Sequence, residues 1–122
     1  MAHALHPSRP ELQDGSHLPR LNGGPVIKVN VKQRYATDAE TGGFFRALCA
    51  EAGVPCQEYV HRADLPCGST IGPITAGQLG ARVVDVGNPM LSMHSARELA
   101  GAEDPALMVA AMRLFFDGAG SL

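Results

Sequence analysis

The 122-residue sequence has no tryptophan, two tyrosines and four phenylalanines, so its core must be built largely from aliphatic side chains. No apolar run approaches the roughly 18 residues that a membrane-spanning helix needs, so we expect no membrane association. Basic blocks are absent as well, and the formal net charge is −2. We therefore expect no nucleic-acid partner.

Cysteine is also scarce. Cys49, Cys56 and Cys67 lack the CxxC spacing of a metal site or a redox pair, and they predict reduced thiols in a cytoplasmic protein. The first residues contain no basic stretch followed by an apolar one, so we expect no signal peptide. With 45% hydrophobic residues, the sequence is apolar enough to fold as one small domain.

The sequence does contain alternating strand-like and helix-like segments. Residues 1–24, rich in histidine, proline and glycine, are expected to form a loop. Strand patterns occur at 25–31, 57–61 and 82–86, and helical patterns at 37–52, at 71–79 and from residue 104. Turn-rich stretches predict loops at 64–72 and 88–94. The repeated strand–helix order over residues 25–122 predicts an α/β fold with a parallel or mixed sheet, flanking helices and right-handed crossovers.

Polar residues and glycine mark the expected helix ends. Thr37 and Glu40 have the spacing of a capping box. Ser95 and Glu98 have the same spacing, which predicts a further short helix from residue 95. Gly80 should close the helix at 71–79. The last helix is expected to have its N-cap at Asp104, a first-turn proline at Pro105, and a buried face that carries Leu107, Ala111, Leu114 and Phe115.

Histidine is the first candidate for chemistry. His3, His6 and His17 crowd the N-terminal segment, where they could bind a metal ion or simply belong to a solvated loop. His94 follows a buried-looking strand, and open α/β sheets place their sites at that position. It could be a metal ligand or a structural histidine that packs at a helix entry.

Lys28 is the second candidate, because it lies in the middle of an apolar strand. Its ammonium could bind a substrate carboxylate, or it could face water from an edge strand. Arg34 and Tyr35 follow this strand and could face the same pocket. The loop 64–72 could bind a carbonyl or carboxylate through its N–H groups, or be an ordinary helix entry. Its Cys67 has no adjacent base, which argues against a nucleophilic thiol.

Four segments together resemble the aspartyl aminopeptidase family. Residues 1–7 (MAHALHP) are similar to the family stretch Asp-Met-Ala-His-Ala-x-His-Pro. Residues 24–30 (GPVIKVN) with 33–36 (QRYA) resemble a second signature, 64–73 (DLPCGSTIGP) a third, and 93–98 (MHSARE) a fourth. They occur in the family's order and at about its spacing, over nearly the whole chain.

The resemblance implies the C-terminal portion of a three-layer, zinc-exopeptidase-like catalytic domain. The family holds two zinc ions with histidine and carboxylate ligands, and the corresponding ligand here is His94. It places His3, Lys28 and Tyr35 at the substrate, where an ammonium would favour an acidic N-terminal residue. The implied activity is release of N-terminal Asp or Glu from peptides, with a homo-oligomer as the expected assembly.

The sequence also departs from the family. The aspartate ligand before Met-Ala-His has no counterpart, because the chain begins at Met1. The remaining ligands and the catalytic glutamate would lie upstream, so we expect no catalytic residue in this chain. A truncated or mis-started product, inactive alone, is the first hypothesis. The alternatives are a non-catalytic paralogue acting as an oligomerisation or binding module, and a small-molecule-binding α/β domain outside the peptidases.

Overall fold

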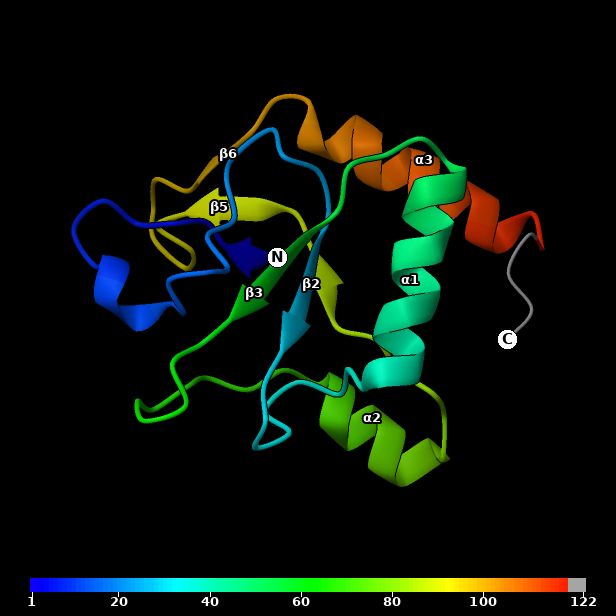
Figure 1. The fold of residues 1–122 in the computed structure, drawn as a ribbon, viewed down its shortest axis with the longest axis horizontal. Coiled ribbons are helices and arrows are strands. Elements are labelled where there is room, and N and C mark those ends of the chain that lie inside the picture. Colours follow the sequence, from blue (N-terminus) through cyan, green and yellow to red (C-terminus); the bar gives the residue numbers. More distant parts are fainter. Residues whose placement is uncertain (119–122) are drawn as a thin grey trace.

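The computed structural model describes residues 1–118, which form two small mixed sheets with helices beside them (Figure 1). This confirms the α/β class. The helices are α1 (Ala39–Glu51), α2 (Gly72–Leu79) and α3 (Asp104–Phe116), with a short 3-10 helix η1 (Pro10–Leu12). The strands are β1 (Ala2–His3), β2 (Val26–Val29), β3 (Gln57–Val60), β4 (Val86–Gly87), β5 (Pro89–Leu91) and β6 (Leu99–Ala100).

Strand β2 lies at the centre of the first sheet, with β3 parallel on one side and β4 antiparallel on the other. The second sheet has β5 in its centre, parallel to β1 and antiparallel to β6. Only Asn88 separates β4 from β5, so one extended segment joins the two sheets. Pairing of segments that are far apart in sequence therefore brings the N-terminal residues beside both sheets.

The alternation of side chains along β2 divides the interior into two parts. Ile27 points to the side covered by α1 and α3, where it packs with Phe45, Leu48 and Ala111. Its neighbour Val26 points to the opposite face and packs with Ala2, Tyr35 and Tyr59. Lys28 shares that second face, because it lies two residues after Val26. The sheet thus has a helix-covered face and a face that carries polar groups.

Helix α1 begins one residue later than the capping-box spacing predicts. Asp38 is the N-cap, and its carboxylate accepts from Thr41 N at 2.7 Å, while Thr41 Oγ1 accepts from Asp38 N at 3.1 Å. The predicted pair of Thr37 and Glu40 is therefore wrong. The Thr37 hydroxyl is engaged elsewhere, since it accepts from Asp85 N at 2.9 Å.

The region from 82 to 100 differs most from the sequence prediction. Of the strand expected at 82–86 only residue 86 is in a strand, because the backbone pairs with β2 at Val86 and Gly87. Strand β5 lies where 88–94 was predicted to be loop. The helix predicted from Ser95 is absent from the described chain, and β6 follows instead. The Glu98 carboxylate accepts from His94 N at 2.6 Å, so it does not cap a helix at Ser95.

Helix α3 has Glu103 at its N-cap, so the prediction of Asp104 as the cap is wrong. Asp104 is fully buried, and its carboxylate accepts from Asn22 N at 2.8 Å and Gly24 N at 2.9 Å. It therefore ties the helix start to the loop that enters β2. On the predicted buried face, Phe115 is 42% exposed and packs edge-on against Phe44 and Phe116. Ala111 is buried, and Leu107 and Leu114 contact the core.

Two further predictions concern the ends of the chain and helix α2. Residues 1–24 are mostly irregular, as expected, but they also contain η1 and β1, which pairs with β5.

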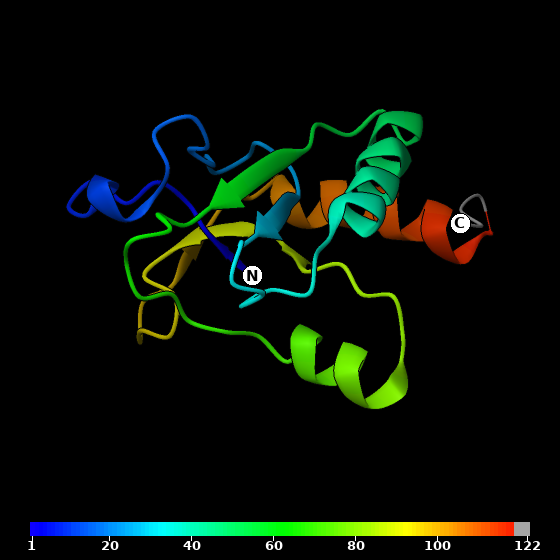
Figure 2. The ribbon, with the colours of Figure 1, turned by 60° about the horizontal axis from the view of Figure 1, so that its bottom comes forward.

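Helix α2 ends at Gly80 in the left-handed conformation, as predicted. Figure 2 shows α2 standing apart from α1 and α3. No helix within residues 1–118 has both the length and the apolarity to cross a membrane. The last residues of the predicted 25–122 segment, 119–122, lie outside the described part.

Candidate functional site

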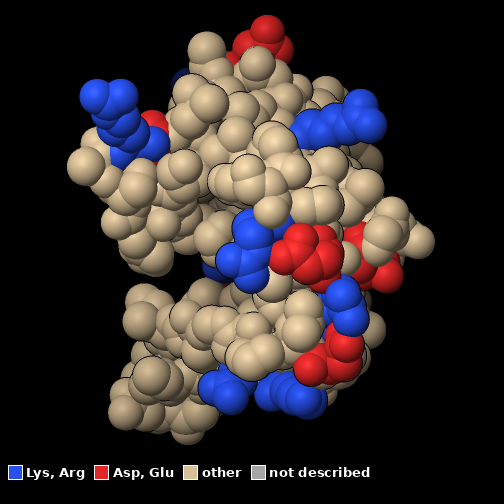
Figure 3. All heavy atoms as spheres, turned by 90° about the vertical axis from the view of Figure 1, so that its left-hand side faces the viewer, with Lys and Arg blue, Asp and Glu red and all other residues tan. Residues whose placement is uncertain are grey.

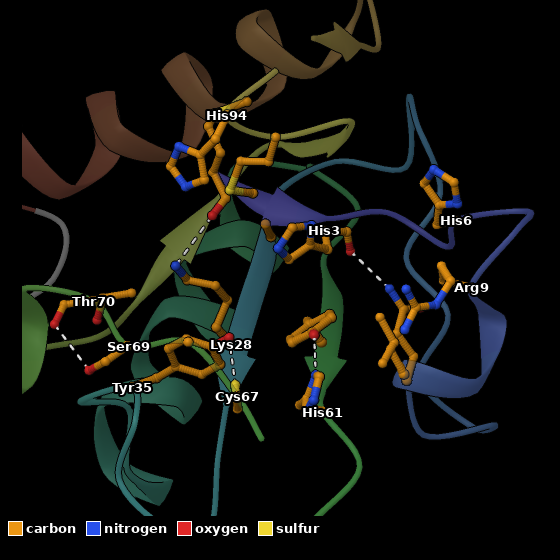
Figure 4. A pocket seen from close by; sticks show the side chains of 17 residues that line it. His3, His6, Arg9, Lys28, Tyr35, His61, Cys67, Ser69, Thr70 and His94 are labelled. Atoms are coloured by element: carbon orange, nitrogen blue, oxygen red, sulfur yellow. Dashed lines mark hydrogen bonds between the residues drawn. The ribbon is translucent and has the colours of Figure 1, made fainter. Parts of the chain in front are cut away.

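A pocket of about 480 Å³ lies on the polar face of β2. Residues from β1, β2 and β3, and from the loops after β2, β3 and β5, line it (Figure 4). All four residues that the resemblance placed at the site line this one pocket: His3, Lys28, Tyr35 and His94. Seen from the side of η1, the surface is mostly uncharged, with acidic and basic side chains interspersed (Figure 3).

Lys28 is the buried cation of this pocket. It is 8% exposed, which contradicts the alternative of an edge-strand lysine that faces water. Its Nζ donates to Met1 O at 3.2 Å and lies 5.0 Å from the centre of the Tyr35 ring. Burial lowers the Lys28 pKa from its ordinary value, and the nearby carboxylate of Asp85 opposes this shift. An ammonium held in this way can bind an anionic group that enters the pocket.

Asp85 is the countercharge of Lys28, and sequence analysis missed it. One carboxylate oxygen lies 4.0 Å from Lys28 Nζ. The other accepts from Ala36 N at 2.7 Å and from Thr70 Oγ1 at 2.9 Å. The carboxylate thus joins the loop after β2 to the loop before α2. In the sequence, the available signal for Asp85 was a single acidic residue within the largely apolar segment RVVDV.

The wall beside Lys28 is aromatic. Tyr59 is the cross-strand partner of Lys28, and Tyr35 packs edge-on against it with ring centres 6.3 Å apart. The Tyr35 hydroxyl lies 3.3 Å from Cys67 Sγ, and burial raises the Tyr35 pKa well above its usual range. Both phenols are therefore neutral at physiological pH and act as hydrogen-bonding groups.

His3 and His94 lie on the side of the pocket above Lys28 in Figure 4. Partial burial of the His3 ring lowers its pKa, and the neighbouring His94 and Lys28 act in the same direction. His94 is exposed and has a positive φ of 71°, an unusual conformation for a residue other than glycine. Backbone strain of this kind is concentrated at functional sites.

The N-terminal histidines do not converge on one point. His3 and His6 line the pocket, but His17 lies outside it and contacts Asp14 at 2.5 Å and Glu58 at 3.5 Å. A fourth histidine, His61, also lines the pocket and was missed. His61 follows Tyr59 by two residues, so the strand period places both side chains on one face of the sheet. That spacing was the only signal for His61 in the sequence.

The loop 64–72 only partly faces the pocket. Cys67, Gly68, Ser69 and Thr70 line it, whereas Asp64 is exposed and pairs with Arg62 at 2.6 Å. Arg34 does not line the pocket, in contrast to Tyr35 beside it. All three cysteines are free thiols.

A metal site requires three or more ligands, and residues 1–118 contain no group of three His, Cys, Asp or Glu side chains placed to hold an ion. The candidate donors that line the pocket are the imidazoles of His3, His6, His61 and His94 and the thiol of Cys67. The residues described here therefore do not form a complete zinc site.

Comparison with known proteins settles the family. Residues 1–116 match the family described as aminopeptidase I zinc metalloprotease (M18). The chain belongs to the M18 peptidase family. Its sequence is 58% identical over 118 residues to a probable M18 family aminopeptidase 2 of Stutzerimonas stutzeri, covering 97% of this chain and 28% of that relative. The corresponding protein of Pseudomonas aeruginosa is 56% identical, with 94% and 27% covered.

Solved M18 structures agree with the fold. The chain superimposes on Ape4, from a cryo-electron-microscopy structure of the Ape4 and Nbr1 complex, with a TM-score of 0.93, 46% identity, and coverage of 98% of this chain and 23% of that one. The match to the mApe1 dodecamer of S. cerevisiae has a TM-score of 0.80 and 31% sequence identity. It covers 97% of this chain and 25% of that one. The chain thus spans about a quarter of the length of the M18 relatives that it matches.

Proposed function

We propose that this chain forms the substrate-binding wall of an M18 aminopeptidase site that releases acidic N-terminal residues from peptides. The observation that carries the proposal is Lys28, a lysine only 8% exposed whose Nζ lies in a pocket with His3, Tyr35 and His94. The cost of burying an ammonium is offset when a carboxylate binds to it. A substrate with an Asp or Glu side chain brings such a carboxylate.

Each site residue has one role in this proposal. Lys28 binds the side-chain carboxylate of the substrate, and Tyr35 holds the ammonium from the opposite side through its ring face, 5.0 Å away. His3, whose lowered pKa favours the neutral ring, donates or accepts a hydrogen bond beside the substrate. His94 supplies one imidazole ligand to zinc, the metal named in the family description.

The proposal places the remaining ligands and the catalytic base outside the described residues, which contain no group of three candidate ligands. The proposal therefore includes inactivity of the chain by itself. The cytoplasmic location suggested by the free thiols, and the homo-oligomeric state known for the mApe1 dodecamer, are also parts of the proposal.

The test is to purify the chain, measure its zinc content by mass spectrometry and assay it with chromogenic aspartyl and glutamyl amides. We expect well under one zinc ion per chain and no chelator-sensitive hydrolysis of either amide. Two tightly bound zinc ions per chain with chelator-sensitive hydrolysis would show that the described residues complete the site, and would refute the claim of inactivity.

A second candidate function is that of a non-catalytic module that self-associates. Large apolar side chains are exposed on both α2 and α3: Ile74 59%, Leu79 75%, Val109 65% and Phe116 76%. Apolar side chains gathered on a protein's surface mark interfaces. We expect sedimentation velocity to show concentration-dependent association, and Leu79→Ser with Phe116→Ser to reduce it relative to the control Arg113→Ser. A monomer at all concentrations would exclude this function.

A further inference from the structure

The fold brings two of the three cysteines together, although the sequence has no CxxC spacing. Cys49 lies in the last turn of α1, and Cys56 directly precedes β3. Figure 1 shows the chain turning back from the end of α1 into β3. Cys49 is fully buried in the core cluster that contains Phe45, and the partly buried Cys56 packs against the same cluster. The pair therefore lies on the helix-covered face of the sheet.

A tight turn holds the two cysteines in place. Gly53 has a positive φ of 66°, and the next residue, Val54, donates its N–H to Cys49 O at 2.8 Å. From Gln57 onward the chain is paired with β2. Backbone hydrogen bonds on both sides of the turn thus fix the position of Cys56 relative to the end of the helix.

A charged pair lies next to the thiols. Arg46 precedes Cys49 by one turn of α1, and its guanidinium forms an ion pair with Glu58 of β3. Glu58 follows Cys56 by two residues, and both charges are close enough to act on the Cys56 thiol. A guanidinium in this position stabilises a thiolate.

The surroundings make the two thiols chemically unequal. A hydrogen bond from the Cys49 thiol to Cys56 Sγ lowers the pKa of Cys56, and Arg46 acts in the same direction, while burial and Glu58 oppose the shift. The same hydrogen bond, together with burial, raises the pKa of Cys49 well above its usual range. Cys56 is thus the partly exposed thiol that forms the nucleophilic thiolate, and Cys49 is the buried thiol beside it.

We propose that Cys56 and Cys49 form a hydroperoxide-reactive dithiol that closes reversibly to a disulfide within the chain. The combination fits this chemistry because redox-reactive cysteines are accessible thiols placed next to a second, resolving cysteine. Such disulfides also occur in otherwise reduced proteins, as transient bonds. The inference does not rest on the proposed peptidase function, since the pocket lies on the other face of β2.

The reaction has two steps. The Cys56 thiolate attacks one oxygen of the hydroperoxide, the O–O bond breaks, and the leaving alkoxide or hydroxide takes a proton from water, which leaves Cys56 as a sulfenic acid. The Cys49 sulfur then attacks the Cys56 sulfur, the S–O bond breaks, and the oxygen leaves as water with the Cys49 proton. Two electrons pass from the two sulfurs to the hydroperoxide.

The test treats the purified full chain with hydrogen peroxide, then unfolds it with N-ethylmaleimide present and maps its tryptic peptides by mass spectrometry. Cleavage after Arg46 and Arg62 places Cys49 and Cys56 in one peptide and Cys67 in the next. We expect the first peptide to lose two hydrogen atoms and to accept no maleimide, while the Cys67 peptide accepts one. Dithiothreitol should restore both thiols. Cys67 is the internal control, because it packs in the other core cluster.

Two variants separate the roles of the cysteines. Cys49→Ala should leave Cys56 oxidised without a partner, so that dimedone traps its sulfenic acid. Cys56→Ala should leave Cys49 reduced, because Cys49 is fully buried. The wild-type measurement needs no variant and is therefore independent of effects on folding. A disulfide from either residue to Cys67, a disulfide between chains, or an unchanged first peptide at peroxide concentrations that oxidise Cys67 would overturn the proposal.

Discussion

At the scale of single residues, the proposed preference of the pocket for acidic ligands rests on the charge of Lys28. Asp85 and the Tyr35 ring hold the ammonium without neutralising it through a close ion pair, since the nearest carboxylate oxygen is 4.0 Å away. An incoming carboxylate can approach more closely than Asp85 does. The preference for acidic ligands would therefore depend on both residues.

Replacing Asp85 by asparagine tests its positioning role. In the wild-type chain one carboxylate oxygen accepts hydrogen bonds from Ala36 N and Thr70 Oγ1. The asparagine amide can keep at most part of these two bonds. We expect the free energy of unfolding in urea to fall by about 1.5–3 kcal/mol, the range for hydrogen bonds to a charged group. The pKa of Lys28 should also fall further, because Asp85 raises it. The exposed Asp117→Asn is the control, and equal stability of the two variants would contradict this role.

The pH dependence of stability tests the burial of Lys28. Its pKa in the folded chain is below the ordinary value of 10.5, with burial as the main cause. Between the two pKa values the unfolded chain binds more protons, so stability rises with pH in this window and is lost as pH falls through the folded-state pKa. The wild-type chain should therefore gain stability relative to Lys28→Met as pH rises towards 10.5. A stability difference between the wild-type chain and Lys28→Met that does not change up to pH 10.5 would contradict the burial of Lys28.

At the scale of helices and strands, local sequence signals were reliable where the element is set by its own residues. The strand around Lys28, the helix after Asp38 and the glycine stop at Gly80 follow from alternation, helical periodicity and backbone freedom. The segment 82–100 was mispredicted because its strands are only two or three residues long and exist through pairing with β1 and β2. Tertiary contacts, which no local pattern reports, decide such short strands.

Asp104 provides a prediction at this scale, since it fixes helix α3 to the loop before β2. Asp104→Asn replaces an oxygen that accepts from a backbone N–H with an amide nitrogen that cannot. We expect a loss of about 2–3 kcal/mol in the free energy of unfolding, measured with urea against Asp117→Asn. Unchanged stability would show that the buried carboxylate does not anchor the helix.

At the scale of the whole molecule, the site could be predicted only in part. The residues His3, Lys28, Tyr35 and His94 were named from three of the four motifs, and the fold brings them to one pocket. Asp85 and His61 were missed because their signals in the sequence are weak, and because their places at the pocket depend on partners distant in the chain. The chain spans 28% of its Stutzerimonas relative, and in the proposed function these residues form one wall of a larger M18 site.

The most direct test of the acidic preference compares two ligands of nearly equal size and different charge. Calorimetric titration of the purified chain with aspartic acid α-amide and with asparagine amide changes only the side-chain carboxylate. We predict at least about tenfold tighter binding of the aspartic acid amide, a difference of about 1.4 kcal/mol, and loss of that difference in Lys28→Met but not in the exposed Lys32→Met. Equal affinity of the wild-type chain for both ligands would contradict the account.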